Sequence, residues 1–214
     1  MFLSPQQMRW SGWLLFIGAL LSIIVLLVEF SVPTSLILTA SAGLVGGLLV
    51  LVGLPGTYIK QRDAVGILGT VGFFVLWITF LVTTLGVNIE EIIIAITTAH
   101  PTAQSVPPLI VNILNLTSLL MLIGVLLYGV QTLRAHIFPS SVGWLLVSTV
   151  AVMTLALFIG SALAQLLYII GELLLQSSFA RLGYALARWP DDIELEPVES
   201  EEMTSVSDSS SNNV

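Results

Sequence analysis

The chain has 214 residues, of which 56% are hydrophobic and only 9% are charged. A soluble domain of ordinary composition has about 25% charged residues, so this composition excludes that class and indicates that lipid surrounds most of the chain. The net charge of -7 comes largely from the region after Trp189, which holds eight of the thirteen acidic residues. No basic patch is present in the sequence, and we therefore expect no nucleic-acid partner.

The residue types that carry most protein chemistry are scarce. The chain has no cysteine, and its two histidines, His100 and His136, lie far apart without the spacing of a metal motif. The sequence contains no recognisable pairing of a nucleophile with a base and no phosphate-binding loop. We therefore predict no catalytic residue, no cofactor and no metal site, and an enzyme is the least favoured class.

Six apolar segments are each long enough to cross a bilayer core of about 30 Å, which takes roughly 20 helical residues. They are predicted at about residues 12–28, 35–54, 65–85, 109–131, 142–159 and 162–182. The second segment ends at Pro55 and carries Thr39, Gly43 and Gly47 at four-residue spacing. Small residues at this spacing let two helix backbones approach closely, and we interpret them as packing within the molecule.

The last two segments are separated by no proline and no charged residue. A single helix of that length would project far out of the bilayer while remaining apolar, so we place a tight turn near Gly160 and Ser161. Residues 1–189 are thus predicted to form one transmembrane domain.

The longest connection, residues 86–108, joins the third and fourth segments. Its isoleucines recur at helical spacing: Ile89, Ile92, Ile93 and Ile96. This pattern predicts a short interfacial helix on the membrane surface. Because the run is rich in β-branched residues, an irregular lid is the alternative.

Basic residues predict the orientation, because they collect in short loops on the cytoplasmic side. With six spans, every basic residue falls on one side: Arg9, Lys60, Arg62, Arg134, Arg181 and Arg188. We therefore expect a multi-pass protein of the plasma membrane with cytoplasmic N- and C-termini. Residues 190–214 are acidic and rich in serine, with too little apolar surface to offset the entropy of ordering, and are expected to form a disordered cytoplasmic tail.

Two stretches carry a resemblance. Residues 53–69, reading GLPGTYIKQRDAVGILG, and residues 129–146, with Leu133-Arg134-Ala135, Pro139 and Gly143-Trp144-Leu145-Leu146, are similar to loops of an uncharacterised group of small multi-spanning bacterial membrane proteins of actinobacterial and Chloroflexi type. The resemblance implies a bacterial plasma-membrane protein of several spans. It implies no activity and assigns no functional residue.

Glu172 is the acidic residue that falls deepest within a predicted span, about ten residues into the sixth. A charge at that depth costs a few kcal/mol, so the side chain is expected to face the bundle interior. Gln165, Tyr168, Glu172 and Gln176 follow one another at spacings of three, four and four, which places them in one stripe on a helix face. We favour a neutral Glu172 that hydrogen-bonds another helix, and the alternative is a proton or cation relay.

Asn112 and Asn115 lie one turn apart near the outer end of the fourth span, where they are candidates to line an outer cavity or to join helices. The sequence as a whole predicts an all-α polytopic protein, a bundle of six transmembrane helices. It favours a non-enzymatic structural or accessory component of the membrane, with the lipid bilayer as partner, and leaves a protein partner or homo-oligomer open. The alternative function is a small permease or proton-coupled transporter that uses Glu172.

Overall fold

The structure, a computed structural model, describes residues 4–31, 36–64, 66–97, 108–159 and 162–188. Its elements are six helices: α1 (Pro5–Ser31), α2 (Leu36–Gln61), α3 (Ile67–Thr97), α4 (Pro108–Ala135), α5 (Ser140–Phe158) and α6 (Ala162–Ala187). Each helix contains a segment long and apolar enough to cross a membrane. The predicted all-α fold, a bundle of six membrane-spanning helices, is confirmed.

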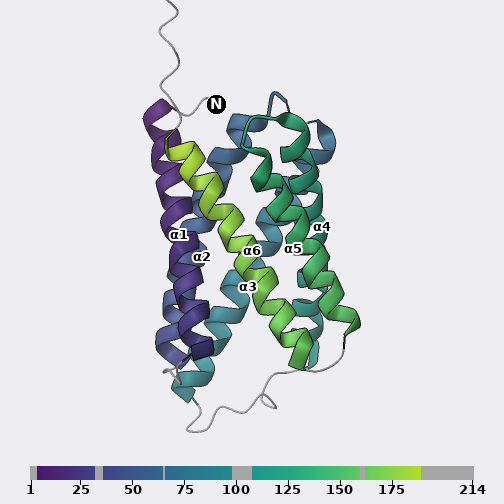
Figure 1. The fold of residues 1–214 in the computed structure, drawn as a ribbon. Coiled ribbons are helices and arrows are strands. Elements are labelled where there is room, and N and C mark those ends of the chain that lie inside the picture. The colour runs from purple at the N-terminus through teal and green to yellow at the C-terminus, as the bar shows by residue number, and fades with distance from the viewer. Residues whose placement is uncertain (1–3, 32–35, 65, 98–107, 160–161, 189–214) are drawn as a thin grey trace, which may run out of the picture.

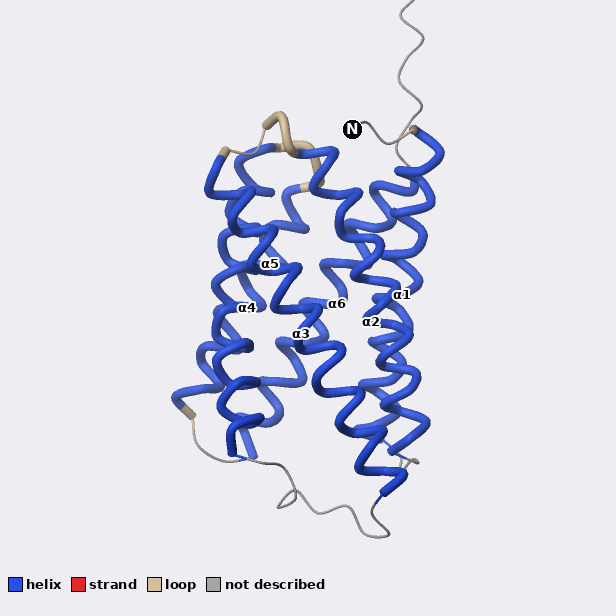
Figure 2. The backbone as a smooth tube through the Cα atoms, turned by 180° about the vertical axis from the view of Figure 1, so that it is seen from behind, coloured by secondary structure: helices blue, strands red, loops and turns tan. Residues whose placement is uncertain are grey.

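Successive helices run up and down and pack side by side, and α6 closes the bundle against α1 (Figure 1). α6 crosses the bundle obliquely, from α5 at its start to α1 at its end (Figure 1). The start of α1 and the end of α6 lie at one end of the bundle, which we call the terminal end, and the other is the distal end. The turns from α2 to α3 and from α4 to α5 are also at the terminal end (Figure 2).

The beginning of α1 is set by a reciprocal cap. The Ser4 amide donates to Oε1 of Gln7 at 2.9 Å, and the Gln7 amide donates to Oγ of Ser4 at 3.2 Å. These two bonds satisfy backbone donors that have no partner inside the helix. Pro5 occupies the first helical position, where its missing N–H is no loss.

The small residues of α2 pack within the molecule, as expected. A Cβ atom on Gly46 would lie 3.2 Å from the carbonyl oxygen of Gly18 on α1, and one on Gly43 would lie 2.6 Å from Oδ1 of Asn88 on α3. In lipid, helices associate through such close van der Waals contact rather than through removal of apolar surface from water. Glycine at these positions therefore fixes how closely α1, α2 and α3 approach.

The two helices that extend furthest beyond their predicted ends are α2 and α3. α2 continues through Pro55 to Gln61, although the sequence placed its end before the proline. α3 runs without a break to Thr97, so residues 89–96 form its last turns and not a separate interfacial helix, which corrects that expectation. At 31 residues α3 is about 46 Å long, which exceeds a bilayer core of about 30 Å. The last turns of α3 can therefore extend beyond the bilayer core as part of the same helix.

The long apolar block after Val142 forms two helices, because α5 ends at Phe158 and α6 begins at Ala162. The expected turn at Gly160 and Ser161 lies outside the described residues, as does the tail at 190–214. The buried core includes large side chains from several helices: Leu15, Leu76, Tyr128, Leu146, Leu175 and Phe179.

Candidate intramembrane binding cavity

Glu172 lies about 15 Å along α6 from the start of the helix, at a rise of about 1.5 Å per residue. Its side chain is half-buried. Oε1 of Glu172 accepts a hydrogen bond of 3.0 Å from Nε2 of Gln176. The two residues are one turn apart on the same helix face, which is why they meet. The bond therefore orients the carboxyl group within α6 and does not join α6 to another helix.

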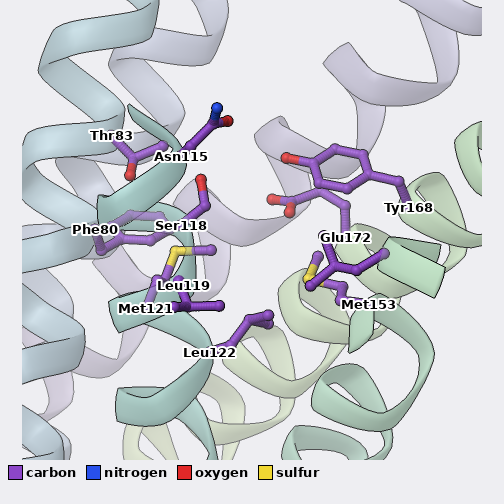
Figure 3. Close-up of a pocket in the computed structure, with 11 residues that line it drawn as sticks. Phe80, Thr83, Asn115, Ser118, Leu119, Met121, Leu122, Met153, Tyr168 and Glu172 are labelled. Atoms are coloured by element: carbon purple, nitrogen blue, oxygen red, sulfur yellow. The ribbon is translucent and has the colours of Figure 1, made fainter. Parts of the chain in front are cut away.

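Beside Glu172 is a cavity of about 410 Å³ that receives side chains from α3, α4, α5 and α6 (Figure 3). Its polar lining residues are Thr83, Asn115, Ser118, Tyr168 and Glu172. Its apolar lining residues are Phe80, Leu119, Met121, Leu122, Met153 and Leu157. The cavity is thus mainly apolar, with a small number of polar groups, as is usual for sites that bind small molecules.

The polar groups face one another from two sides. Tyr168 and Glu172 project from α6 toward Asn115 and Ser118, which project from α4 (Figure 3). Tyr168 and Glu172 from the predicted polar stripe of α6 therefore meet Asn115 from the predicted asparagine pair of α4 at one cavity. Gln176, which lies one turn along α6 from Glu172, is buried.

Three of the candidate residues do not line this cavity. Gln176 is buried one turn beyond Glu172. Gln165 and Asn112 are both exposed, one turn closer to the distal end than Tyr168 and Asn115 respectively. Tyr168, Glu172 and Asn115 are thus the predicted residues that line the cavity.

An aromatic pair packs at the wall of the cavity. Phe80 lines the cavity, and its ring meets the ring of Phe179 edge-on with centroids 5.7 Å apart. Phe179 is fully buried and lies two turns along α6 from Glu172, on the terminal side. The pair thus joins α3 to α6 beside the cavity.

The cavity opens to the outside of the bundle. Tyr168 is 55% exposed and Leu119 is 50% exposed, and Asn115 is exposed as well. These residues come from α4 and α6, the two helices whose polar side chains face each other across the cavity (Figure 3). A small molecule can thus reach Glu172 without unfolding of the helices.

The carboxyl group of Glu172 has no basic partner among the described residues. An ion pair joins Arg62 and Asp63 near the terminal end, and none of the described residues that line the cavity is basic. Within the described ranges, no three acidic or histidine side chains are grouped so that they could hold a metal ion. A charged carboxyl group in apolar surroundings is costly, which favours a proton or a bound cation on Glu172.

Several lining residues carry no signal in the sequence. Phe80, Met121 and Met153 look like ordinary apolar residues of membrane helices, and Thr83 and Ser118 are common in such helices. They become part of a site because α3, α4 and α5 turn these faces toward α6. Periodicity within one helix finds the Glu172 stripe, but it does not find the residues opposite.

Comparison with known proteins gives no relative for this chain: no family model, no curated protein and no solved structure matches it.

Proposed function

We propose that this integral membrane protein is a small permease that binds its substrate in the cavity beside Glu172. The observation that carries the proposal is the place of Glu172, a carboxyl group deep in a span that faces a cavity of about 410 Å³. Ionisable groups at such depth are typical of substrate and proton pathways in membranes. Midplane binding sites between helices are typical of transporters.

The competing proposal, a structural or accessory component, gives Glu172 the role of joining helices. That role requires a hydrogen bond from Glu172 to a different helix. The hydrogen bond that the structure records goes to Gln176 on α6 itself. The cavity and this bond together favour the permease.

The transport cycle that fits this geometry is alternating access. In this cycle we assign the contact between Phe80 and Phe179 the role of separating the cavity from the terminal end. Transport then requires the two rings to part while the opening beside Tyr168 closes. Because α6 packs on α5 and on α1, a change in its tilt is the simplest motion that does both. Glu172 would carry a proton when the substrate is absent, which couples transport to a proton gradient.

We also propose a bacterial plasma membrane and cytoplasmic termini. Arg9, Lys60, Arg62, Arg134 and Arg188 belong to the starts or ends of helices, or to turns, at the terminal end. Positively charged residues are retained on the cytoplasmic side. In this orientation the cavity lies in the half of the bundle that is nearer the outside. Because the proton and the substrate occupy Glu172 in turn, the protein is an exchanger.

The test is a two-step measurement on the purified full-length protein. Small molecules of cationic, neutral and anionic classes are first screened for an increase in melting temperature. Those that stabilise the protein are then followed into proteoliposomes under an imposed proton gradient. Glu172→Gln keeps the shape of the side chain and removes its charge, so it should abolish uptake while the melting temperature without ligand stays near the parental value.

The matched control is Glu29→Gln, which removes an exposed carboxylate at the end of α1 and should leave uptake unchanged. A second pair of variants probes the cavity itself. Leu119→Trp fills space in the cavity, whereas Leu116→Trp adds the same bulk to an exposed position one turn away that does not line it. Parental uptake by Glu172→Gln and Leu119→Trp, or a screen in which no molecule stabilises the protein, would overturn the proposal.

A further inference from the structure

We infer that the substrate of this cavity is a lipophilic organic monocation, such as a protonated amine that carries an aromatic or branched apolar group. The inference rests on the proposed function and names the substrate class of the same site. Three independent properties of the cavity support it: its charge, the chemistry of its walls and its size.

The first property is charge. Among the described residues that line the cavity, Glu172 is the one acidic residue, and none is a lysine, arginine or histidine. The recorded bond from Gln176 satisfies part of the carboxyl group but brings no positive charge to it. A cation that displaces the proton of Glu172 pairs with the carboxylate, and this attraction is strong in a medium of low dielectric constant. An anion finds no positively charged side chain among the described residues of the lining.

The second property is the chemistry of the walls. Phe80 and Tyr168 present aromatic rings, and Met121 and Met153 present thioethers. The faces of aromatic rings attract cations whose charge is spread over alkyl groups, and methionine adapts to irregular apolar shapes because it is flexible and polarisable. Leu119 and Leu157 add apolar surface. A small inorganic cation would gain little from such walls.

Hydrated metal cations fit poorly for a further reason. Mg²⁺ and Ca²⁺ are held by six or more oxygen atoms at about 2.0–2.6 Å. The oxygen-bearing side chains of this cavity sit on opposite sides of it, with Tyr168 and Glu172 facing Asn115 and Ser118 across open space (Figure 3). An organic cation can touch both sides at once, with its charged end at Glu172.

The third property is size. A volume of about 410 Å³ lies at the small end of the range of about 300–1,000 Å³ that is common for small-molecule sites. One ring with a short charged arm fits this space. The opening beside Leu119 and Tyr168 is lined by apolar and aromatic surface, which also suits entry of such a molecule.

The test uses three molecules of nearly the same shape and different charge: 3-phenylpropylammonium, 3-phenylpropanol and 3-phenylpropionate. Binding is measured by isothermal titration to the full-length protein in nanodiscs of uncharged lipid, so that partition into a charged membrane does not mimic binding. We expect the ammonium compound to bind at least tenfold more tightly than the alcohol, and the carboxylate to show no binding.

Two variants assign the binding to the cavity. Glu172→Gln should reduce the preference for the ammonium compound over the alcohol by at least tenfold. Leu119→Trp should weaken binding of all ligands, and Leu116→Trp should leave their affinities unchanged. Leu119→Trp alters a half-exposed side chain, so it tests the cavity even if Glu172→Gln does not fold.

The outcomes separate this inference from the proposed function. If the alcohol or the carboxylate binds best and Leu119→Trp weakens that binding, the cation inference is overturned while the cavity remains a binding site. If the ammonium compound binds equally well to Glu172→Gln, the role of the carboxyl group is overturned. If Leu119→Trp weakens the binding of none of the three compounds, this inference is overturned. If the stability screen also finds no molecule that stabilises the protein, the proposed function is overturned as well.

Discussion

The indole nitrogen of Trp77 donates a hydrogen bond of 3.0 Å to the carbonyl oxygen of Leu51. In a regular helix this oxygen would accept the N–H of the residue four positions later. That residue is Pro55, which has no N–H to donate. A side chain of α3 thus replaces the missing backbone bond of α2, and this is why α2 does not end at its proline.

Removal of this bond should be costly only while the proline is present. Trp77→Phe keeps most of the ring and loses the donor, and we expect it to destabilise the protein by about 1 kcal/mol, the scale of interhelical hydrogen bonds in membranes. In a Pro55→Ala background the new N–H can bond Leu51, so the loss should shrink. The measurement is a double-mutant cycle of unfolding free energies in mixed detergent micelles. Equal effects of Trp77→Phe in both backgrounds would contradict this account.

The contact between α1 and α6 depends on two glycines that face each other. A Cβ atom on Gly12 would lie 2.7 Å from the carbonyl oxygen of Gly183, and one on Gly183 would lie 2.5 Å from the amide nitrogen of Phe16. Both neighbours are backbone atoms that cannot move alone, so α1 and α6 would have to separate.

We therefore expect Gly12→Ala and Gly183→Ala each to lower the unfolding free energy by about 2 kcal/mol, in the range of 1–3 kcal/mol for overpacking. Gly66→Ala is the control, because the nearest atom to its added Cβ would be 3.8 Å away. The three variants are compared by thermal unfolding in the same detergent. Parental stability of both α1–α6 variants would show that these helices do not pack as described.

The number of helices could be predicted from the sequence because the thickness of a bilayer sets the length of an apolar span. Two helix ends could not be predicted, for a specific physical reason. Pro55 reads as a helix end when α2 is considered alone, and the group that compensates for it, Trp77, lies 26 positions away on α3. The third span is predicted to end at residue 85, whereas α3 continues to Thr97 and Gly86 lies within the continuous helix without a positive φ.

The candidate site was predictable only in part, for a related reason. The stripe of Tyr168, Glu172 and Gln176 follows from the helical repeat alone. The residues opposite depend on which faces of α3, α4 and α5 turn inward, and no spacing within one helix encodes that. Asn115 was found because its amide is unusual within a span. Met121 and Met153 are typical of any apolar helix and could not have been distinguished.

A buried glutamine near the terminal end provides a test of stability. Gln61 is fully buried at the end of α2, and neither its Oε1 nor its Nε2 has a hydrogen-bond partner among the described residues. A buried polar group without a partner costs about 1–3 kcal/mol. Gln61→Leu should therefore raise the unfolding free energy by about 1 kcal/mol, whereas Gln6→Leu, at an exposed position of α1, should have little effect. If Gln61→Leu is less stable than the parent, the amide of Gln61 instead belongs to a polar network that stabilises the fold.

The proposed orientation can be measured directly because the parent chain has no cysteine to react. Ser31 and Ser140 are exposed at opposite ends of the bundle, and Asp63 is exposed at the same end as Ser140. In intact cells a membrane-impermeant maleimide should label Ser31→Cys alone. Ser140→Cys and Asp63→Cys should react only after permeabilisation. Labelling of all three variants in intact cells would contradict an even number of spans with cytoplasmic termini.

The bond between Gln176 and Glu172 leads to the final prediction. Because it lies within α6, Glu172 should contribute little to holding helices together. Glu172→Leu leaves the buried Nε2 of Gln176 without its partner and should cost about 1 kcal/mol, whereas replacement of both members of a pair by apolar groups is nearly neutral or stabilising. The double variant Glu172→Leu with Gln176→Leu should thus be at least as stable as the parent and unable to bind the cationic probe. Unfolding titrations in mixed micelles provide the measurement, and Glu29→Leu is the control for loss of an exposed carboxylate. If the double variant is less stable than the parent, the carboxyl group and the amide help to join the helices, and the structural role of Glu172 is favoured over transport.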